Sequence, residues 1–313
     1  MKKYLFLALF FAACTNKAEL KSENTENIAE ISVKIPTELF KAVDLTKPNL
    51  FVEGIEGPAF YDGFLYAVNF QKSGTVGKVN PQTGECELFV NLPEGSIGNG
   101  IRFNSKGEML IADYKKHNVL KVNMKTKEIS IFANENKMIG NSPNDLAISS
   151  TDVIYASAPN WADNTGSLWK IDTEGKVFLL EKNMGTTNGV EVSPKDDFLY
   201  VNESVQRKIW KYNLSPKGEI SNKKLLIEFA DHGFDGMRCD NDGNLYVCRY
   251  GAGEVAKISP EGKILQTIKL TGKNVSNITF GGQDGKTCFV TLQDRGNIEI
   301  FRVDQAGKFW KAL

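Results

Sequence analysis

A repeat with a period of 43 to 46 residues constrains the fold of this chain more than any other feature. Each copy has a short polar turn followed by an apolar strand rich in aromatic and β-branched residues. The copies are GFLYAV, GEMLIA, DVIYAS, DFLYVN, GNLYVC and KTCFVT, and their third residues are Leu65, Met109, Ile154, Leu199, Leu245 and Cys288. A period of this length, filled with strands and almost without a helical pattern, is typical of β-propeller blades.

Two further strands follow most copies of the repeat. The first of them reads TVGKVN, NVLKVN, SLWKID, KIWKYN, EVAKIS or IEIFRV, and the next reads CELFVN, EISIFA, KVFLLE, KLLIEF or ILQTIK. The sixth repeat leaves little room for an outer strand, which residues 34–53 can supply, closing the ring and removing its exposed edges. We therefore predict an all-β fold: a six-bladed β-propeller over residues 34–313, built from four-stranded antiparallel sheets, with an N-terminal strand closing the last blade.

The first 33 residues predict export. A short basic start precedes an apolar run, residues 4–13, which is too short to span a bilayer and is followed directly by Cys14. We predict a signal peptide over residues 1–13 and a flexible polar tether over residues 14–33.

The predicted cleavage site resembles that of bacterial lipoproteins, in which Cys14 would become the lipidated first residue. Phe11 departs from this pattern, since Leu is usual at that position, and a plain secretory signal is the alternative. The resemblance implies an exported lipoprotein held at a membrane, in the periplasm or on the cell surface, by its lipid anchor alone.

The composition excludes several other classes. Lys and Arg number 38 and Asp and Glu number 38, so no basic excess is available for binding nucleic acid. Two histidines are too few for a His-rich metal site. The four cysteines after Cys14 match no zinc or redox motif, and we predict that they are buried free thiols: Cys86, Cys239, Cys248 and Cys288.

One position upstream of each repeat strand carries a carboxylate or a carboxamide. It lies 9 to 11 residues before the repeat position, where the innermost strand of each blade is expected to begin, and its occupants are Glu56, Asn99, Asn144, Asn188, Asp235 and Asn277. Innermost strands line the central channel, so these side chains should form one ring at one of its mouths. Six oxygen donors, two of them acidic, suit a hard cation such as Ca²⁺ or Mg²⁺. The alternative is that each residue only caps a turn, but Glu is a poor turn residue.

These positions also carry a family resemblance. Glu56-Gly-Pro, Ser-Pro-Asn144-Asp145, Thr-Asn188-Gly-Val, Asp235-Gly-Met and the later SNITFGGQDGKTCFVT resemble the gluconolactonase/regucalcin (senescence marker protein) family over residues 50 to 305. The resemblance implies a six-bladed propeller with one divalent cation in its channel, often Ca²⁺ and sometimes Zn²⁺ or Mn²⁺, with Mg²⁺ as a further candidate.

The resemblance also implies roles for individual residues. The implied metal ligands are Glu56, Asn144, Asn188 and Asp235. Asp235 matches the proposed general base, with Glu56 as the other acid able to assist water, and Asn99 and Asn144 are implied to contact substrate. Many members carry Arg where this chain has Ser142, which puts a sugar lactone in doubt more than the metal.

Other residues near the expected channel mouth have two interpretations each. Trp161 lies in a predicted loop, residues 158–165, that is longer than its counterparts, and it could stack on a ligand or pack on the surface. His232, three residues before Asp235, could assist proton transfer or be a solvated loop residue.

The resulting hypothesis is a metal-dependent lactone hydrolase whose cation polarises the carbonyl while Asp235 assists the attack of water. Its small-molecule partner would be a lactone or a sugar acid, and either a monomer or a dimer fits. One alternative is a non-catalytic, metal-containing propeller that binds a sugar acid or another small ligand. Another is an NHL-like protein-interaction propeller, which has no reason to keep Glu56 and Asp235 in the ring.

Overall fold

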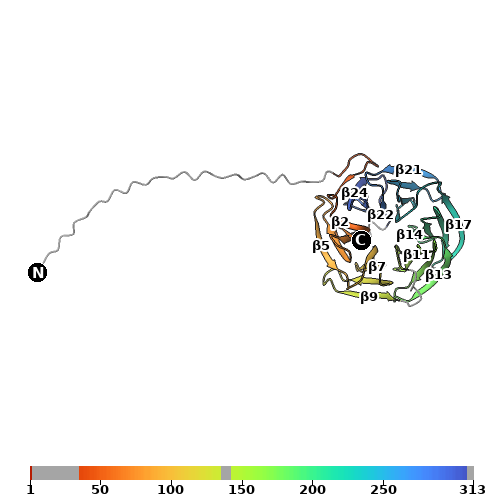
Figure 1. The fold of residues 1–313 in the computed structure, drawn as a ribbon, viewed down its shortest axis with the longest axis horizontal. Coiled ribbons are helices and arrows are strands. Elements are labelled where there is room, and N and C mark those ends of the chain that lie inside the picture. The colour runs from red at the N-terminus through yellow and green to blue at the C-terminus, as the bar shows by residue number, and fades with distance from the viewer. Residues whose placement is uncertain (2–34, 135–141, 309–313) are drawn as a thin grey trace. The chain divides into compact units, whose positions relative to one another are not determined.

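Six antiparallel sheets, each of four strands, form the ring of a β-propeller (Figure 1). The computed structural model describes Met1, residues 35–134 and residues 142–308, and the propeller belongs to the unit Ser32–Leu313. The described residues contain no helix, and therefore no helix long and apolar enough to cross a membrane. The predicted all-β, six-bladed fold is confirmed. The signal peptide, the tether and Cys14 lie outside the described residues and stay predictions.

We number the blades 1 to 6; in blades 1 to 5 the strands run from the channel outwards in chain order, and in blade 6 the outer strand comes from the N-terminal segment. The innermost strands are β2 (Phe51–Tyr61), β6 (Gly98–Phe103), β10 (Leu146–Ile148), β14 (Thr187–Val192), β18 (Met237–Cys239) and β22 (Val275–Gly281). The second strands, which carry the repeat, are β3 (Phe64–Phe70), β7 (Met109–Asp113), β11 (Ile154–Asn160), β15 (Phe198–Glu203), β19 (Leu245–Arg249) and β23 (Thr287–Leu292). The third strands are β4 (Thr75–Val79), β8 (Asn118–Val122), β12 (Thr165–Ile171), β16 (Lys208–Leu214), β20 (Glu254–Ile258) and β24 (Asn297–Arg302). The outer strands are β5 (Cys86–Asn91), β9 (Ile129–Asn134), β13 (Val177–Met184), β17 (Ile220–Glu228), β21 (Ile264–Lys269) and β1 (Val43–Asp44).

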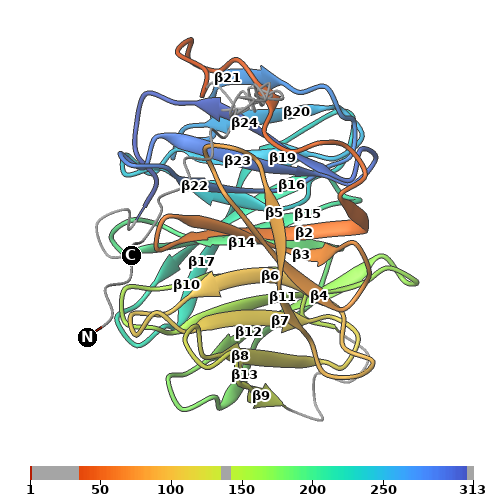
Figure 2. The same cartoon turned by 90° about the vertical axis from the view of Figure 1, so that its left-hand side faces the viewer.

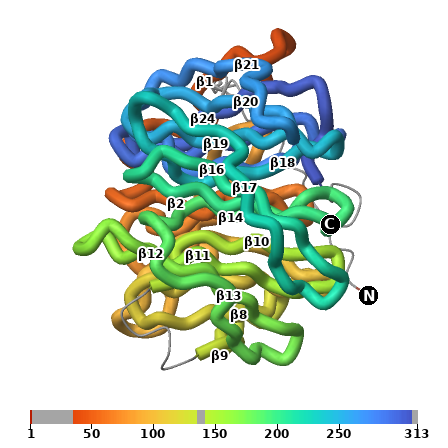
Figure 3. The backbone as a smooth tube through the Cα atoms, turned by 90° about the vertical axis from the view of Figure 1, so that its right-hand side faces the viewer, coloured from red at the N-terminus to blue at the C-terminus, as the bar shows by residue number. Residues whose placement is uncertain are grey.

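Burial explains why the repeat is conspicuous in the sequence. The second strand of a blade lies between two neighbouring blades, so both of its faces are covered; every residue of β7, β19 and β23 is buried. Outer strands face water, and all but one residue of β21 are exposed. Neighbouring blades share hydrophobic clusters, as where Leu110 of blade 2 packs with Ile148 and Trp169 of blade 3. Figures 2 and 3 show the blades edge-on.

The N-terminal segment closes the ring, as predicted. Val43 and Asp44 of β1 pair with Ile300 and Glu299 of β24, and so supply the outer strand of blade 6. A bidentate ion pair secures this short strand: the two terminal nitrogens of Arg295 donate to the Asp44 carboxylate at 2.6 and 2.8 Å. Planar guanidinium–carboxylate pairs of this kind are stronger than single contacts.

We expect Asp44→Ala to lower the free energy of unfolding by about 1 kcal/mol, since the pair is partly exposed and solvent screens it. Equilibrium urea denaturation measures the change. The matched control is Glu38→Ala, which removes an exposed ion pair with Lys41 from the same segment and should cost less than about 0.5 kcal/mol. Equal losses in the two variants would show that Asp44 does not secure the closing strand.

Two smaller predictions are modified. All four cysteines after Cys14 are free; Cys239, Cys248 and Cys288 are buried as predicted, but Cys86 is only partly buried because it lies in an outer strand. The segment 158–165 is not a long loop. Its extra residues lengthen β11 and β12, and the turn between these strands is confined to residues 161–164.

Candidate functional site

A cavity of about 590 Å³ opens at one mouth of the channel. It is lined by every residue that the sequence analysis assigned to a metal, substrate or catalytic role, namely Glu56, Asn99, Asn144, Trp161, Asn188 and Asp235. The sixth ring residue, Asn277, lies against them, and its Nδ2 donates to Oε2 of Glu56 at 2.8 Å. The structure therefore brings the ring together, while the roles of its members stay predictions.

Strand irregularities aim the ring side chains at the channel. In blades 1, 2, 4 and 6 the pairing register of the innermost strand shifts beside the ring residue. In blades 3 and 5 the regular strand begins two residues after Asn144 and Asp235. Such bulges bend a strand and redirect its side chains, and they are common next to active sites.

Glycines after the ring residues let neighbouring blades meet at the axis. The Gly100 amide donates to the Asn144 carbonyl at 3.0 Å, and the Gly236 amide donates to the Ser276 carbonyl at 2.7 Å. A Cβ on Gly236 would lie 2.1 Å from the side chain of Asn277, which no side chain tolerates. These positions need glycine because another backbone and its side chain pass directly over them.

Glu56 and Asp235 are two buried carboxylates with like charges close together. Burial, reinforced by the charge of Asp145, raises the pKa of Glu56 to about 7. Burial, reinforced by the charge of Glu56, raises the pKa of Asp235 well above its ordinary value. Hydrogen bonds offset only part of this cost: Oε2 of Glu56 accepts from the Gly57 amide at 2.6 Å as well as from Asn277. A positive ion among these groups would remove the repulsion.

Two amide oxygens of the ring also lack partners. Oδ1 of Asn99 and Oδ1 of Asn188 are buried and accept no hydrogen bond from any described residue. A buried acceptor without a partner costs free energy, so such atoms call for a ligand or an ion. Within the described part of the chain no three His, Cys, Asp or Glu side chains gather into a metal site. Here the donors are two carboxylates and several amides, an oxygen set that fits a hard divalent cation.

The rim of the cavity contains residues that the sequence analysis missed. Arg207, Tyr250 and Gln293 line it together with Trp161 and His232. Tyr250 and Gln293 each come directly after the second strand of their blade, as Trp161 does. A count of five residues downstream of the repeat position would have found Tyr250 and Gln293, whereas Arg207, at the end of its turn, lies outside this count.

Ser142 lies apart from this cavity lining. Its hydroxyl is 3.2 Å from Nδ1 of His117, which occupies a turn with a positive φ of 59°. Neither residue is among the described residues that line the cavity. The position at which many relatives are implied to carry Arg is therefore occupied by a short side chain bonded to a neighbouring blade.

The sequence profile of the SMP-30/Gluconolactonase/LRE-like region matches residues 56–294, from the first ring residue to the rim. The chain belongs to this family. Among its relatives within the family, a gluconolactonase of Zymomonas mobilis is 28% identical over 227 residues, which cover 64% of this chain and 63% of that protein. A 6-deoxy-6-sulfogluconolactonase of Pseudomonas putida is 28% identical over 131 residues, 41% of this chain and 45% of that protein. Both matches span less than two thirds of the relative.

Solved structures share the fold. The crystal structure of a calcium-binding protein, regucalcin, from Agrobacterium tumefaciens superposes with a TM-score of 0.73 at 20% identity, covering 85% of this chain and 94% of that one. At this identity the likeness shows the shared fold alone.

Proposed function

We propose that this protein is a lactone hydrolase that works with one divalent cation, most simply Ca²⁺. The observation that carries the proposal is the pair of buried carboxylates, Glu56 and Asp235, on the floor of a cavity beside unpartnered amide oxygens. Family membership supports it, since the two relatives above are named gluconolactonase and 6-deoxy-6-sulfogluconolactonase. The regucalcin with the same fold is described as calcium-binding.

The residues that would hold the cation are Glu56, Asn144, Asn188 and Asp235. All four are buried, and they present only oxygen or amide groups to the cavity. When bound, a divalent cation supplies a Lewis acid that polarises the lactone carbonyl and offsets the negative charge developing on its oxygen.

Asp235 is the better placed of the two acids to move a proton. Its backbone is fixed, because its amide donates to the Cys248 carbonyl at 3.0 Å and its carbonyl accepts from Nδ2 of Asn202 at 2.7 Å. Its carboxyl group has the Asn188 side chain as one hydrogen-bond partner and shares a hydrogen bond with Glu56, whose Oε2 also accepts from the Gly57 amide and from Asn277. Asp235 therefore keeps more of its accepting capacity for a water molecule.

The reaction balances with water alone. The water oxygen bonds to the carbonyl carbon as Asp235 accepts its proton, and the ring C–O bond then breaks. Asp235 returns the proton to the leaving alkoxide, which leaves a hydroxy acid and the original carboxylate. The product releases a proton to solvent at neutral pH, because an aliphatic carboxylic acid is ionised there.

Trp161 is expected to contact the substrate from the rim. Its side chain is 45% exposed although it lines the cavity, so its ring is available for stacking. We expect Trp161→Ala to raise KM about 3- to 10-fold with little change in kcat, as for the loss of one aromatic contact. Initial-rate kinetics measure both constants, and Leu179→Ala, which removes an exposed apolar side chain from an outer strand, is the control. An unchanged KM would leave Trp161 as a surface packing residue.

Because Ser142 is outside the cavity lining, this chain presents no long donor from that position to the hydroxyl groups of a sugar lactone. We expect weak turnover of sugar lactones, and we expect Ser142→Arg to raise their kcat/KM about tenfold relative to aliphatic lactones by adding hydrogen bonds to hydroxyls. A competition assay with both substrate classes measures the ratio of kcat/KM for sugar lactones to kcat/KM for aliphatic lactones. Ser150→Arg, at the other end of the channel, should leave the ratio unchanged. A ratio that Ser142→Arg does not alter would contradict this account of specificity.

A panel of sugar and aliphatic lactones tests the proposed function. The full-length chain is supplied with Ca²⁺, and hydroxy-acid formation is followed by NMR while lactone binding is followed by calorimetry. Product formation supports the hydrolase. Binding without product across the panel would favour the non-catalytic propeller, and neither binding nor product would favour a protein-interaction propeller.

A further inference from the structure

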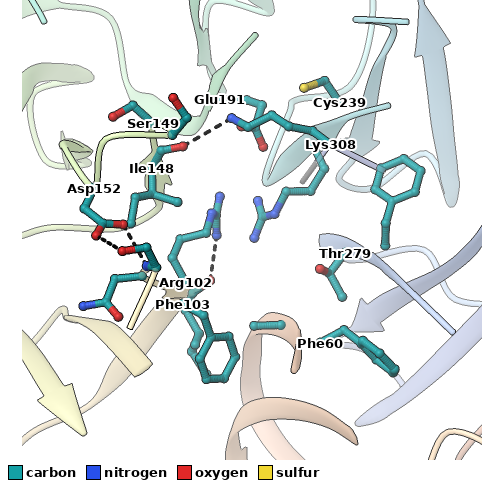
Figure 4. A pocket seen from close by; sticks show the side chains of 17 residues that line it. Phe60, Arg102, Phe103, Ile148, Ser149, Asp152, Glu191, Cys239, Thr279 and Lys308 are labelled. Carbon is teal, nitrogen blue, oxygen red and sulfur yellow. Dashed lines mark hydrogen bonds and ion pairs between the residues drawn. The ribbon is translucent and has the colours of Figure 1, made fainter. Parts of the chain in front are cut away.

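A second cavity, of about 190 Å³, lies at the other end of the innermost strands (Figure 4). It is lined by the last residues of these strands and by the turns that follow them, whereas the ring residues lie further upstream, within or just before the same strands. The residues three positions after the ring residues contribute to it or adjoin it, and they are Ala59, Arg102, Ala147, Glu191, Arg238 and Phe280. The channel therefore presents acids at one end and two arginines near the other.

The two arginines share one carboxylate. Nη1 of Arg102 donates to Oδ1 of Asp145 at 3.3 Å, and Nη1 of Arg238 donates to Oδ2 of the same residue at 3.4 Å. The same two nitrogens also donate to the carbonyls of the preceding residues, each at 2.8 Å. Two positive charges thus face one negative charge, and Asp145 is only 1% exposed.

The other terminal nitrogen of each arginine has no hydrogen-bond partner among the described residues. Nη2 of Arg102 and Nη2 of Arg238 are buried and donate to no described residue. Both side chains are more than nine-tenths buried and line the cavity, and Figure 4 shows the Arg102 guanidinium in the open space at its centre. Burial and the charge of Arg238 lower the pKa of Arg102 to about 10. Buried charged donors without partners are costly, so this arrangement calls for an anion.

The other charged residues at the cavity do not neutralise the excess positive charge of Arg102 and Arg238 over Asp145. Nζ of Lys308 is 2.8 Å from Oε1 of Glu191 and also donates to the carbonyls of Ile148 and Val192, so this pair is internally balanced. Asp152 is a further carboxylate of the lining, but it lies at the exposed edge, where it accepts hydrogen bonds from Ser105 and solvent screens its charge. The arginine pair therefore carries one uncompensated positive charge.

We propose that this cavity is a binding site for a small monocarboxylate, whose two oxygens accept from Nη2 of Arg102 and Nη2 of Arg238. A single excess charge matches a monoanion better than a phosphate dianion, and guanidinium groups bind carboxylates through directed hydrogen bonds. The walls include Phe60, Phe103 and Phe280, which suit a short carbon body on the carboxylate. The volume admits only a few heavy atoms, since one water occupies about 30 Å³. The proposal is independent of the proposed hydrolase activity.

The test is a titration of the full-length chain with ¹³C-carboxyl acetate and with propionate at constant ionic strength, followed by NMR and calorimetry. We expect one saturable site, and we expect Arg102→Met and Arg238→Met each to weaken binding at least about tenfold, the usual effect of losing a charged hydrogen bond. Arg302→Met, on the outer part of blade 6, should bind acetate as the unchanged chain does. Asp235→Asn should also retain acetate binding, which separates this site from the ring.

A cavity-filling variant protects the test against misfolding. Ala59→Met keeps both arginines and Asp145 but places a longer side chain in the cavity, and it should abolish acetate binding. Acetamide, which has the same shape without the charge, should not bind. Absence of acetate binding to the unchanged chain, or binding that survives Ala59→Met, would overturn the proposal, as would a crystal structure grown in acetate with only water between the two Nη2 atoms.

Discussion

Asp235→Asn is expected to lower kcat/KM for lactone hydrolysis by about 10²- to 10⁴-fold, the range for loss of a general base. The amide cannot accept the proton of the attacking water, and it supplies a weaker ligand to the cation. Asn fits the space of Asp and leaves the backbone hydrogen bonds to Cys248 and Asn202 in place. The fold should therefore persist, and the loss should appear in kcat when cation is saturating.

The matched control is Asp242→Asn, which removes a carboxylate from the exposed β18–β19 turn of the same blade. Stopped-flow or pH-stat rates for both variants, with circular dichroism to verify folding, decide the result. Activity in Asp235→Asn equal to that of the control would remove Asp235 from the mechanism.

Glu56→Gln is expected to stabilise the metal-stripped protein while it abolishes the response to cation. The pKa of Glu56 is raised to about 7 by burial and by Asp145, so the folded state disfavours its charge. A raised carboxyl pKa costs nothing at low pH; the cost develops as pH rises from the ordinary value through 7 and is complete above it. Gln can keep accepting from the Gly57 amide, so at pH 8 the gain should be on the order of 3 kcal/mol.

Added Ca²⁺ should reverse this order of stability. A ligand that binds only the folded state at 1,000 times its Kd stabilises by about 4.1 kcal/mol, which exceeds the advantage of the variant, so the unchanged protein should rise above Glu56→Gln in Tm while the Tm of the variant should not change. Differential scanning calorimetry with chelator and with Ca²⁺ measures all four states. Glu87→Gln, an exposed acid in the same blade, should behave as the unchanged protein. A metal-stripped Glu56→Gln protein less stable than the unchanged chain would contradict the account of the buried acid pair.

The fold was predictable from the repeat because every blade of a propeller has the same succession of strands and turns. Residues such as Leu65 and Leu245 are buried in second strands between blades, and this environment forces an apolar run every 43 to 46 residues. The closing strand could be predicted because the sixth repeat lacked an outer strand. The ring was visible for the same reason, since one position in each blade faces the channel.

Contacts between blades were not predictable in this way. Asp145 lies 43 residues from Arg102 and 93 residues from Arg238, and no local pattern indicates that one carboxylate serves both. Pro159 and Asn160 are typical turn residues and predict a loop, but in the structure they continue strand β11. Packing between parts of the chain that are distant in sequence determines both the shared Asp145 carboxylate and the length of the β11–β12 pair.

If a cation held by the ring makes this chain a lactone hydrolase, acid formation by metal-stripped protein should depend on added Ca²⁺. Ca²⁺ is added stepwise to the full-length chain with a responsive lactone, and acid formation and Tm are followed together. We expect proton release to begin over the same Ca²⁺ range that raises Tm and to stop when chelator is added. Release that persists at full rate in chelator, or a rise in Tm without release from any lactone of the panel, would contradict this expectation.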